Sequence, residues 1–364
     1  MSKKKPTIDD VATLSGVART TVSRVINDGP NVRPSMRRRV MEAIDQLGYK
    51  VNVQARNLAA GSSRQIVLIH ESNLEAEPNS YYHSGLELGA LTSCARHGYQ
   101  LTTQAVDYQA GGWRERILSF IESGRCDGLI LPPPFSDEPD LVRAIMAADC
   151  PVVCISAGET VRAIAPSIGI DDETAGYDMA RYLIALGHRR LAYIKGLEGH
   201  ISAEGRYAGF VRALTEVGID PASIASARGN FTFRSGIECT EHILAARDDI
   251  TVIVCGNDDM AAGAMLVCHK HGLTIPTRIS VVGFDDTPLS DIMWPPLTTV
   301  HQPIKEIARR AADLLIRRVE GGTPGDEAVH EFVGHRIVER QSAAPPVNAS
   351  SNLPFPIAPE SQLD

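Results

Sequence analysis

The spacing of apolar positions in the first 50 residues predicts three short helices. Thr7, with an acidic residue three positions later, marks the start of the first helix, and Gly16 ends it. A second helix is expected over 18–27, and a third begins at Pro34 and ends at Gly48. The apolar positions expected to share one core are Ile8, Val11, Ala12, Leu14, Val22, Val25, Ile26, Val40, Ala43, Ile44 and Leu47.

From residue 65 onward the pattern changes to short, continuous apolar runs that end in Gly, Pro, Ser or Asp. These runs cover 65–70, 127–134, 151–156, 190–196, 250–258 and 279–286. Segments with helical spacing lie between them, such as 81–98, 177–188 and 260–272. Buried runs that alternate with helices are typical of parallel strands in βαβ units. The sequence therefore predicts a small all-α part followed by an α/β part with parallel sheets.

Charge divides the chain at the same place as the hydrophobic pattern. The first 64 residues contain 12 Lys and Arg against five Asp and Glu, a balance of about +7. The remaining 300 residues contain 24 basic and 39 acidic side chains, a balance of −15. A basic head on an acidic body indicates a polyanionic partner for the head. A solvated basic face without a ligand is the alternative interpretation.

The second predicted helix carries polar side chains that suit a DNA groove. Two short helices around a tight turn, packed on a third, form a helix-turn-helix unit. If the valines face the core, the exposed side carries Arg19, Thr20, Ser23 and Arg24. Arg can bond bidentately to guanine, and Thr offers a hydroxyl or a methyl group to a base edge. Short donors suited to phosphates are Thr21, Ser23 and Asn27. The alternative is a small helical bundle without a ligand.

The segment 52–61, "NVQARNLAAG", predicts a linker that is a helix only in the presence of a partner. It is shorter than the ~12–15 residues that an isolated helix needs in water. Leu58 stands among small residues, and apolar wedges of this kind enter a minor groove and unstack a base step. A packing role for this leucine is the alternative.

The stretches "TIDDVATLSGVARTTVSRVIN", "RVMEAIDQLGYKVN" and "ARNLAAG" resemble the headpiece and hinge of the lactose/galactose repressor family of bacterial transcription regulators. The resemblance implies base reading by Arg19, Thr20 and Arg24, and phosphate contacts by Thr21, Ser23 and Asn27. It implies that Leu58 intercalates, with Ala55 and Ala59 beside it. Thr7 and Asn52 complete the expected set of DNA-contacting residues.

The resemblance also exposes three departures from the family pattern. Ala18 and Arg33 stand where the family usually has serine caps, and Val51 stands where a proline usually precedes the hinge. Losing a cap costs about 0.5–2 kcal/mol of helix stability. These departures remove no base-reading side chain, but they predict a headpiece that depends more on DNA for its order.

Polar side chains follow the apolar runs of the acidic body. Ligands of parallel sheets bind beyond the carboxyl ends of the strands, and the side chains found there are Ser156, Lys195, Asn257, Asp258, Asp285 and Asp286. Capping of the following helix is the alternative for each, above all for Asp258. Convergence of several such groups indicates a binding pocket.

This region resembles the family's periplasmic-binding-protein-like sensor domain, through "VCGNDDMAAGAM", "ISVVGFDDTPLSDIMWPPLTTVHQP" and "AEGRYAGF". The resemblance implies polar clamps at Arg206, Asn257 and Asp285, and an aromatic stack at Phe231. The residues expected to line the same pocket are Tyr81, Tyr82, Ser156, His200 and Ser202. It further implies two lobes whose relative angle changes when a ligand binds between them.

The expected effector is a sugar or glycoside. Carboxylate, guanidinium and amide groups bond several hydroxyls at once, and an aromatic face covers the apolar side of a sugar ring. A purine that acts as a corepressor is the alternative, since it would also stack on Phe231. Purine-sensing relatives, however, place an arginine near the position of His200. In sugar-sensing members an acidic residue often occupies the position of Ser156, and its absence leaves the hydroxyl pattern of the sugar open.

We expect a homodimer on a pseudo-palindromic operator, because a twofold axis places two recognition helices in successive major grooves. The expected boundaries are a headpiece at 1–50, a hinge at 51–64, a sensor at 65–340 and a disordered tail at 341–364. Within the sensor, one lobe is expected at about 65–160 plus 291–325, and the other at 161–290 plus 326–340.

Other classes of protein find less support in the sequence. The N-terminus has no apolar signal segment, and no apolar run approaches the ~20 residues of a membrane span. Seven scattered cysteines indicate reduced core thiols of a cytoplasmic protein. No nucleophile elbow, Walker loop or dinucleotide fingerprint occurs, so neither an enzyme nor a cofactor or metal site is expected. A solute-binding protein without a DNA role is disfavoured by the basic head.

Overall fold

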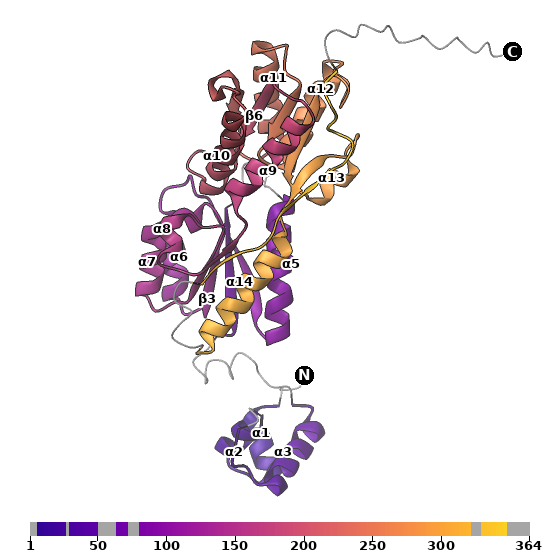
Figure 1. Cartoon of the computed structure of the whole chain (residues 1–364). Coiled ribbons are helices and arrows are strands. Elements are labelled where there is room, and N and C mark those ends of the chain that lie inside the picture. Colours follow the sequence, from indigo (N-terminus) through magenta and orange to yellow (C-terminus); the bar gives the residue numbers. More distant parts are fainter. Residues whose placement is uncertain (1–5, 27–28, 50–62, 72–79, 322–328, 348–364) are drawn as a thin grey trace, which may run out of the picture. The chain divides into compact units, whose positions relative to one another are not determined.

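The computed structural model describes residues 6–26, 29–49, 63–71, 80–321 and 329–347, and the chain forms two compact units, Met1–Ser63 and Arg64–Asp364 (Figure 1). We call the first unit the headpiece and the second the sensor. Among the described residues, no helix is both long and apolar enough to span a bilayer.

The headpiece consists of three helices, α1 (Ile8–Ser15), α2 (Arg19–Ile26) and α3 (Pro34–Leu47). Its core contains Val11, Val22, Val25, Val40 and Ala43, with the predicted Ile26, Ile44 and Leu47 packed against it. The predicted helices and core are thus confirmed. Leu14 is the exception. It is 45% exposed, because the short α1 ends one residue later and its last turn leaves the core.

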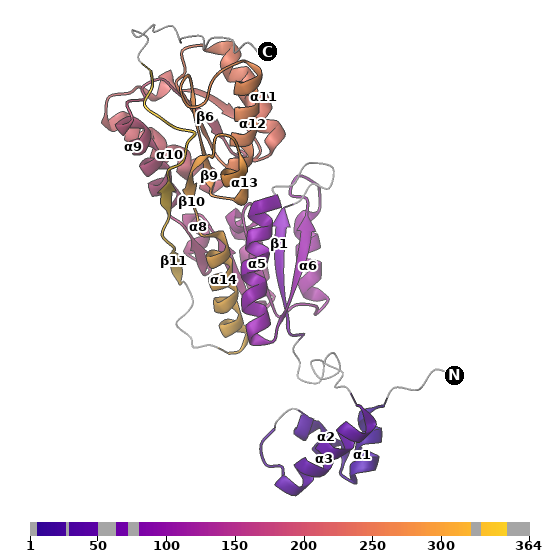
Figure 2. The same ribbon diagram turned by 90° about the vertical axis from the view of Figure 1, so that its right-hand side faces the viewer.

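The sensor contains two six-stranded sheets, each flanked by helices (Figures 1 and 2). The first sheet has the order β11-β5-β4-β3-β1-β2 and the second the order β12-β10-β9-β8-β6-β7. The strand pairs are parallel, except that β10 and β12 are antiparallel. We call the part built on the first sheet lobe 1 and the part built on the second sheet lobe 2. The predicted fold class is confirmed.

The strands of lobe 1 are β1 (Gln65–Glu71), β2 (Gln100–Val106), β3 (Gly128–Leu131), β4 (Val152–Ile155), β5 (Ser167–Gly169) and β11 (His330–Phe332). Those of lobe 2 are β6 (Leu191–Lys195), β7 (Ala225–Arg228), β8 (Val252–Cys255), β9 (Ser280–Asp285), β10 (Thr298–His301) and β12 (Arg336–Val338). The central strands β1, β3, β4, β6, β8 and β9 coincide with the six predicted apolar runs.

The helices of lobe 1 are α5 (Ser80–His97), α6 (Trp113–Glu122), η1 (Phe135–Asp137), α7 (Pro139–Ala147), α8 (Glu159–Arg162) and α14 (Ile304–Val319). Those of lobe 2 are α9 (Asp172–Ala185), α10 (Ile201–Glu216), η2 (Pro221–Ser223), α11 (Phe233–Ala246), α12 (Asp258–Lys270) and α13 (Pro288–Ile292). In both views α14 lies beside α5, and α9 beside α10.

The lobe predicted from the sequence is wrong for three strands. Strand β5 pairs with β4 in lobe 1, and β11 adds to β5 there. Strand β10 pairs with β9 and therefore belongs to lobe 2. The chain thus crosses between the lobes after β5, after β10 and after β11. These strands have three or four residues each, so the hydrophobic pattern gives little sign of them.

The beginning of the predicted disordered tail is packed against lobe 2, so that expectation is wrong for 341–347. The Ser342 side chain is fully buried, accepts from the Thr298 backbone N–H and donates to the Val281 carbonyl. The Ala344 carbonyl lies 3.0 Å from the Nε2 atom of His188. Hydrogen bonds of this kind cannot be predicted from a composition rich in Pro and Ser. Residues 348–364 lie outside the described residues.

Candidate DNA-binding and effector-binding sites

Helix α2 presents the side chains that the sequence analysis predicts on its outer face. Val22 and Val25 are buried, whereas Arg19, Thr20 and Arg24 are exposed. Thr21 and Ser23 are half-buried at the borders of this face. We call Arg19, Thr20 and Arg24 the recognition face. The apolar side of the same helix anchors it to the core, and the Nε atom of the exposed Arg19 lies 3.5 Å from the Asp9 carboxylate.

The ends of the headpiece helices differ in how they are held. Thr7 forms a reciprocal capping box with Asp10, so its hydroxyl serves α1. Arg33 stands at the N-cap of α3 in place of a serine and, as predicted, its side chain makes no capping hydrogen bond. The turn before α2 is held instead by Arg39, whose Nη2 atom donates to the Gly16 carbonyl at 3.4 Å.

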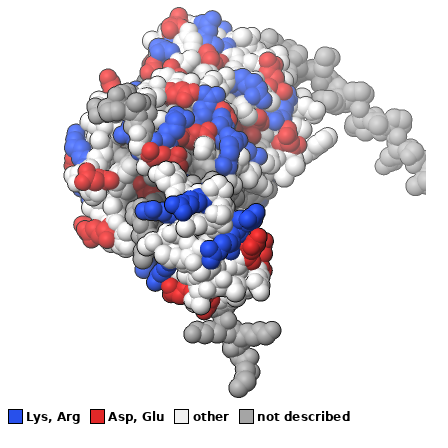
Figure 3. All heavy atoms as spheres, turned by 90° about the horizontal axis from the view of Figure 1, so that it is seen from below, with Lys and Arg blue, Asp and Glu red and all other residues white. Residues whose placement is uncertain are grey.

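Basic side chains outnumber acidic ones in the headpiece. Residues 6–26 and 29–49 contain six arginines and four acidic side chains. In Figure 3, which views all heavy atoms of the chain from below, Lys and Arg side chains are interspersed with Asp and Glu side chains. The remaining DNA-contact predictions, Asn27, Asn52, Ala55, Leu58 and Ala59, lie outside the described residues.

Arg206 on α10 is the centre of the candidate effector site. Its side chain is 6% exposed, and its Nε atom donates to the Asp172 carboxylate at 2.8 Å. Its Nη1 atom donates to the Gly256 carbonyl at 2.9 Å and lies 3.9 Å from the Asp285 carboxylate. The guanidinium group also lies over the Phe284 ring, 3.7 Å from its centroid. These contacts fix the guanidinium group in one position without a ligand.

Asp285, the last residue of β9, carries a carboxylate in a costly environment. Burial raises its pKa to about 7, although Arg206 and a hydrogen bond from Gln302 oppose the shift. The Gln302 amide donates to the carboxylate at 2.5 Å. The pKa of Asp172 is also raised by burial, against the attraction of Arg206. Burial therefore disfavours the charged form of both carboxylates. A buried carboxylate with a shifted pKa is a candidate functional group.

Tyr82, on α5 of lobe 1, belongs to the same cluster of interacting groups. Burial and the neighbouring carboxylates, with Asp285 foremost, raise the pKa of its phenol. The same phenol interacts electrostatically with Arg206 and Asp172 in lobe 2. Its neighbour Tyr81 is 38% exposed, so only one of the two predicted tyrosines is placed with the buried groups.

Phe231 and His200 form an aromatic corner in lobe 2. Their ring centroids are 5.0 Å apart in an edge-to-face arrangement. Phe231 is seated on Gly196, where an added Cβ would lie 2.1 Å from the ring. His200 caps α10, and burial together with Arg206 lowers its pKa to about 3, so the imidazole is neutral. Asn257 holds the corner, since its amide donates to the Phe231 carbonyl at 2.9 Å.

Backbone conformation is unusual at three of the predicted effector residues. Ser156, Phe231 and Asp285 have φ angles of 50°, 65° and 111°. Non-glycine residues avoid this region unless the surrounding structure holds them there, and such strain gathers at ligand-binding sites. Three of the nine predicted effector residues therefore stand at strained positions.

The two lobes touch at the start of α10. The Ile201 backbone N–H donates to the Asp137 carboxylate at 3.1 Å, and the Ser202 hydroxyl donates to the Ser156 carbonyl at 3.4 Å. The second oxygen of Asp137 is buried without a hydrogen-bond partner, and burial raises the pKa of this carboxyl to about 7. Both contacts join α10, which carries Arg206, to lobe 1.

A hollow of about 430 Å³ opens beside these contacts. It contains Ser156 from lobe 1 and Asp172 and Ser202 from lobe 2. Of the nine predicted effector residues, only Ser156 and Ser202 line this hollow. Outside it, Phe231 contacts both His200 and Asn257, and Arg206 contacts Asp285.

Sequence reasoning missed Asp137, Asp172 and Gln302. Asp172 stands in an acidic pair directly after β5, and Asp137 follows the apolar run of β3. The carboxyl-end rule would have found both. Asp258 is a correction of another kind. The helix cap is Asn257, whereas Asp258 accepts hydrogen bonds from the Thr287 N–H and the Thr299 hydroxyl and serves the interior of lobe 2.

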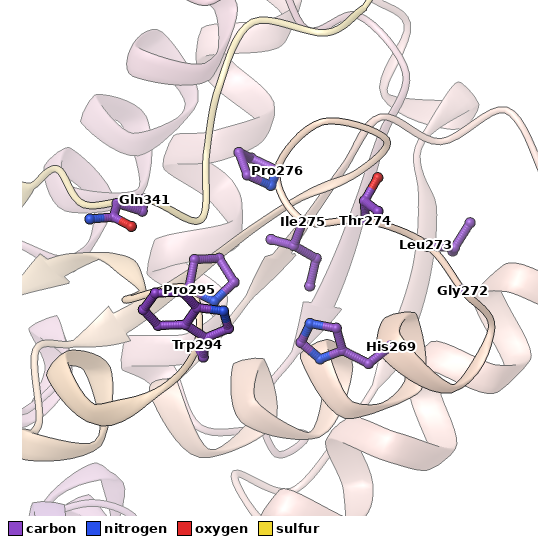
Figure 4. A pocket seen from close by; sticks show the side chains of 9 residues that line it. All are labelled: His269, Gly272, Leu273, Thr274, Ile275, Pro276, Trp294, Pro295 and Gln341. Carbon is purple, nitrogen blue, oxygen red and sulfur yellow. The ribbon is translucent and has the colours of Figure 1, made fainter. Parts of the chain in front are cut away.

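A second hollow, of about 680 Å³, lies on lobe 2 (Figure 4). Trp294 and Pro295 form one side of it, and His269 and Ile275 form the other. Trp294 is 79% exposed, and the neighbouring Ile292 is 73% exposed. Within the described part of the chain, no three His, Cys, Asp or Glu side chains are arranged as metal ligands.

Comparisons with known proteins agree with both units. Residues 7–52 match the model "Bacterial regulatory proteins, lacI family", and residues 180–343 match "Periplasmic binding protein-like domain". The catabolite control protein A of Priestia megaterium is 33% identical over 337 residues, which cover 92% of this chain and 98% of that protein. The HTH-type transcriptional repressor PurR of Vibrio vulnificus is 32% identical and covers 86% of this chain and 92% of that protein.

Two solved structures are similar over nearly the whole chain. The lac repressor dimer bound to operator and the anti-inducer ONPF has a TM-score of 0.81 at 28% identity, covering 94% of this chain and all of that one. The CelR–cellobiose complex has a TM-score of 0.68 at 29% identity, covering 93% and 100%. The chain therefore belongs to the lacI family of bacterial regulatory proteins and is a DNA-binding regulator of transcription.

Proposed function

We propose that this protein is a cytoplasmic, dimeric repressor that binds a pseudo-palindromic operator and is released from it by a small sugar or glycoside. The observation that carries the effector part is the cluster of Asp137, Asp172, Arg206 and Asp285 at the junction of the lobes. We propose that it has no catalytic role, in keeping with relatives that are regulators.

The recognition face supports the DNA part of the proposal. In it, Arg19, Thr20 and Arg24 are exposed on a helix whose opposite side is buried. An inserted α-helix offers such side chains to the major groove, where each base pair has a distinct pattern of donors and acceptors. The related lac repressor was solved as a dimer on its operator. Two recognition faces in such a dimer would read two half-sites one helical turn apart.

The chemistry of the cluster favours a neutral polyol. Three carboxylates and one guanidinium group offer many acceptors and few donors, which suits a ligand rich in hydroxyl groups. The unpartnered Asp137 oxygen is one acceptor for a ligand hydroxyl. The ring of Phe231 would cover the apolar face of a pyranose. A similar chain, CelR, was solved with cellobiose.

A purine corepressor is the second candidate. PurR of Vibrio vulnificus is 32% identical to this chain, and the corner of Phe231 and His200 could stack on a base. His200 is a neutral imidazole held by a cap, because burial and Arg206 lower its pKa to about 3. It therefore offers a purine no positive charge. We rank the sugar first for this reason.

Release of the repressor from DNA by the ligand would act through α10. The helix carries Arg206, and its first turn contacts Asp137 and the Ser156 carbonyl across the lobe junction. A ligand bound to Arg206 competes for these contacts and so favours another angle between the lobes. A typical coupling of this kind is about 1–3 kcal/mol, or roughly 5–150-fold in affinity.

Exposed apolar side chains support self-association of the sensor. Ile292 and Trp294 stand out in lobe 2, and Leu88 and Leu91 on α5 are 48% and 46% exposed in lobe 1. In both views, α13 lies just beyond one end of α5, so these side chains belong to neighbouring elements (Figures 1 and 2). We propose that a second copy of this chain covers them.

The test is a thermal-shift screen of the full chain against cellobiose, other disaccharides, aryl glycosides and purine bases. A sugar that raises the Tm of the wild type, and not that of Asp285→Ala, supports the proposal. The Asp140→Ala variant, altered at an exposed side chain, serves as the matched control. A response to purines alone, or a response that Asp285→Ala retains, contradicts it.

A further inference from the structure

Two cysteines meet at the base of lobe 1, at the end of the sheet away from the effector residues. Cys126 precedes β3, and Cys150 precedes the neighbouring strand β4. The strands pair in parallel with Leu129 opposite Val152, which puts Cys150 within one residue of the position opposite Cys126. Neighbouring strands lie ~4.8 Å apart. With a shift of one residue, ~3.3 Å along the strand, the two Cα atoms are expected ~5.8 Å apart, within the ~4.4–6.8 Å that a disulfide requires.

The two cysteines belong to the same apolar core. Cys150 is 6% exposed in the apolar core of lobe 1, and the partly exposed Cys126 packs against that core. A hydrogen bond between the thiols lowers the pKa of Cys126 and raises the pKa of Cys150. Cys126 is therefore the better nucleophile, and it is also the thiol that solvent can reach.

The other cysteines lack this combination. All seven lie in the described part of the chain, and Cys126 alone among them is not classed as buried. Burial raises the pKa of Cys94, Cys154 and Cys239, and of the remaining two in lobe 2. Their thiols are consequently poor nucleophiles without access to solvent.

We propose that Cys126 and Cys150 form a peroxide-oxidisable dithiol, a modification site of lobe 1 that is separate from the effector site. Its substrate is hydrogen peroxide or another small hydroperoxide. The pair is built like a reactive thiol with its resolving partner, since the accessible Cys126 packs against the core in which Cys150 is buried.

The reaction consumes one peroxide for each disulfide. The Cys126 thiolate attacks one peroxide oxygen, so that an S–O bond forms, the O–O bond breaks and hydroxide leaves as water after taking a proton. Cys126 is then a sulfenic acid. The Cys150 sulfur attacks the Cys126 sulfur, the S–S bond forms, the S–O bond breaks and water leaves with the Cys150 proton. Two electrons pass from the thiols to the peroxide.

The site is adjacent to the point where the described sensor begins. Asp127 follows Cys126 directly, and its carboxylate accepts from the Arg64 backbone N–H at 2.7 Å. Its own N–H donates to the Gln65 carbonyl at 2.8 Å. Closing an S–S bond of about 2.05 Å draws Cys126 toward Cys150 and displaces Asp127 with it. Oxidation therefore acts on the first residues of β1, through which the sensor continues to the headpiece in sequence.

The experiment treats the full reduced protein with hydrogen peroxide and maps thiols by mass spectrometry without reduction. The expected result is one disulfide linking Cys126 to Cys150. Cys126→Ser should abolish it, and Cys150→Ser should instead leave a sulfenic acid at Cys126 that a dimedone-type reagent labels. Cys154→Ala, altered four residues away in β4, should behave as the wild type. Oxidation of Cys126 no faster than of Cys239, or a disulfide between other pairs, overturns the proposal.

A second arm measures operator affinity, which rests on the proposed DNA-binding function. Peroxide should weaken operator binding of the wild type by at least about fivefold, the lower end of a typical coupling, and a thiol reductant should restore it. Cys126→Ser should be insensitive. A disulfide that forms but leaves operator affinity unchanged overturns the proposed effect of oxidation, through Asp127, on the start of β1. Failure of the reduced protein to bind any operator refutes the proposed function instead, while the thiol map still decides the dithiol.

Discussion

Replacing Asp285 with Asn should stabilise the sensor at neutral and alkaline pH and abolish its response to effector. The two side chains have the same shape, and Asn can still accept the hydrogen bond that Gln302 donates at 2.5 Å. Arg206 retains its shorter contact with Asp172 at 2.8 Å. The substitution therefore removes one buried charge and leaves the packing in place.

The magnitude follows from the pKa of Asp285, which burial raises from an ordinary value of 3.8 to about 7. Between these two values the folded state binds more protons than the unfolded state, so the free energy of unfolding falls as pH rises. The penalty builds from about pH 4 and is complete just above pH 7. One pKa unit corresponds to 1.36 kcal/mol, so the advantage of the Asn variant should grow by about 2–3 kcal/mol between pH 5 and pH 8.

The assay is urea unfolding followed by tryptophan fluorescence at pH 5, 6, 7 and 8. Both tryptophans, Trp113 and Trp294, belong to the sensor, so the signal reports that unit alone. Asp140→Asn, at a side chain that is 71% exposed, is the control and should show no such trend. An Asp285→Asn advantage that is the same at all four pH values, or an unaltered effector response, would refute the assignment of Asp285 as a strained binding group.

Three further predictions concern DNA binding, effector binding and dimerisation. Arg24→Ala should weaken operator binding by about 1–3 kcal/mol and leave effector binding unchanged; fluorescence anisotropy checks this, and an equal loss on random DNA would contradict base reading. Gly196→Ala should displace the Phe231 ring, because the new Cβ would lie 2.1 Å from it, and weaken effector binding by about 1 kcal/mol in calorimetry; an unchanged affinity would remove Phe231 from the site. Trp294→Ala should weaken the dimer by about 2 kcal/mol in analytical ultracentrifugation, whereas Val217→Ala, also at an exposed apolar side chain, should not; a dimer insensitive to both would place the interface elsewhere.

Much of the fold could be predicted because its central elements carry strong local signals. Buried strands such as β8 and β9 are continuous apolar runs, since helices cover both faces of their sheet. In the edge strand β2 only the last residue is buried, and the three-residue β11 carries no apolar run. Strands of this kind depend on pairing with distant residues. The lobe to which they belong is therefore a tertiary property that no window of sequence contains.

The residues of the candidate sites also divide into those with a local sequence signal and those that depend on tertiary contacts. Arg206 and Asp285 could be found because each stands in a motif of the family, and Val22 and Val25 fixed the face on which Arg24 is exposed. Asp137 follows the apolar run of β3 and could have been named as a candidate by the carboxyl-end rule, but nothing in "PPPFSD" shows that α10 of the other lobe donates a hydrogen bond to it. Such a contact between distant segments is identified only when the segments are placed together.

The central claim is that one small ligand, bound at the Arg206 cluster, controls operator affinity. The most direct test selects an operator from a pool of random duplexes and measures its dissociation constant with and without the sugar that raises the Tm. We predict a rise of about 5–150-fold for the wild type and no change for Asp285→Asn. An operator affinity that the bound sugar leaves unaltered, or the same rise in the Asp285→Asn variant, would contradict the account.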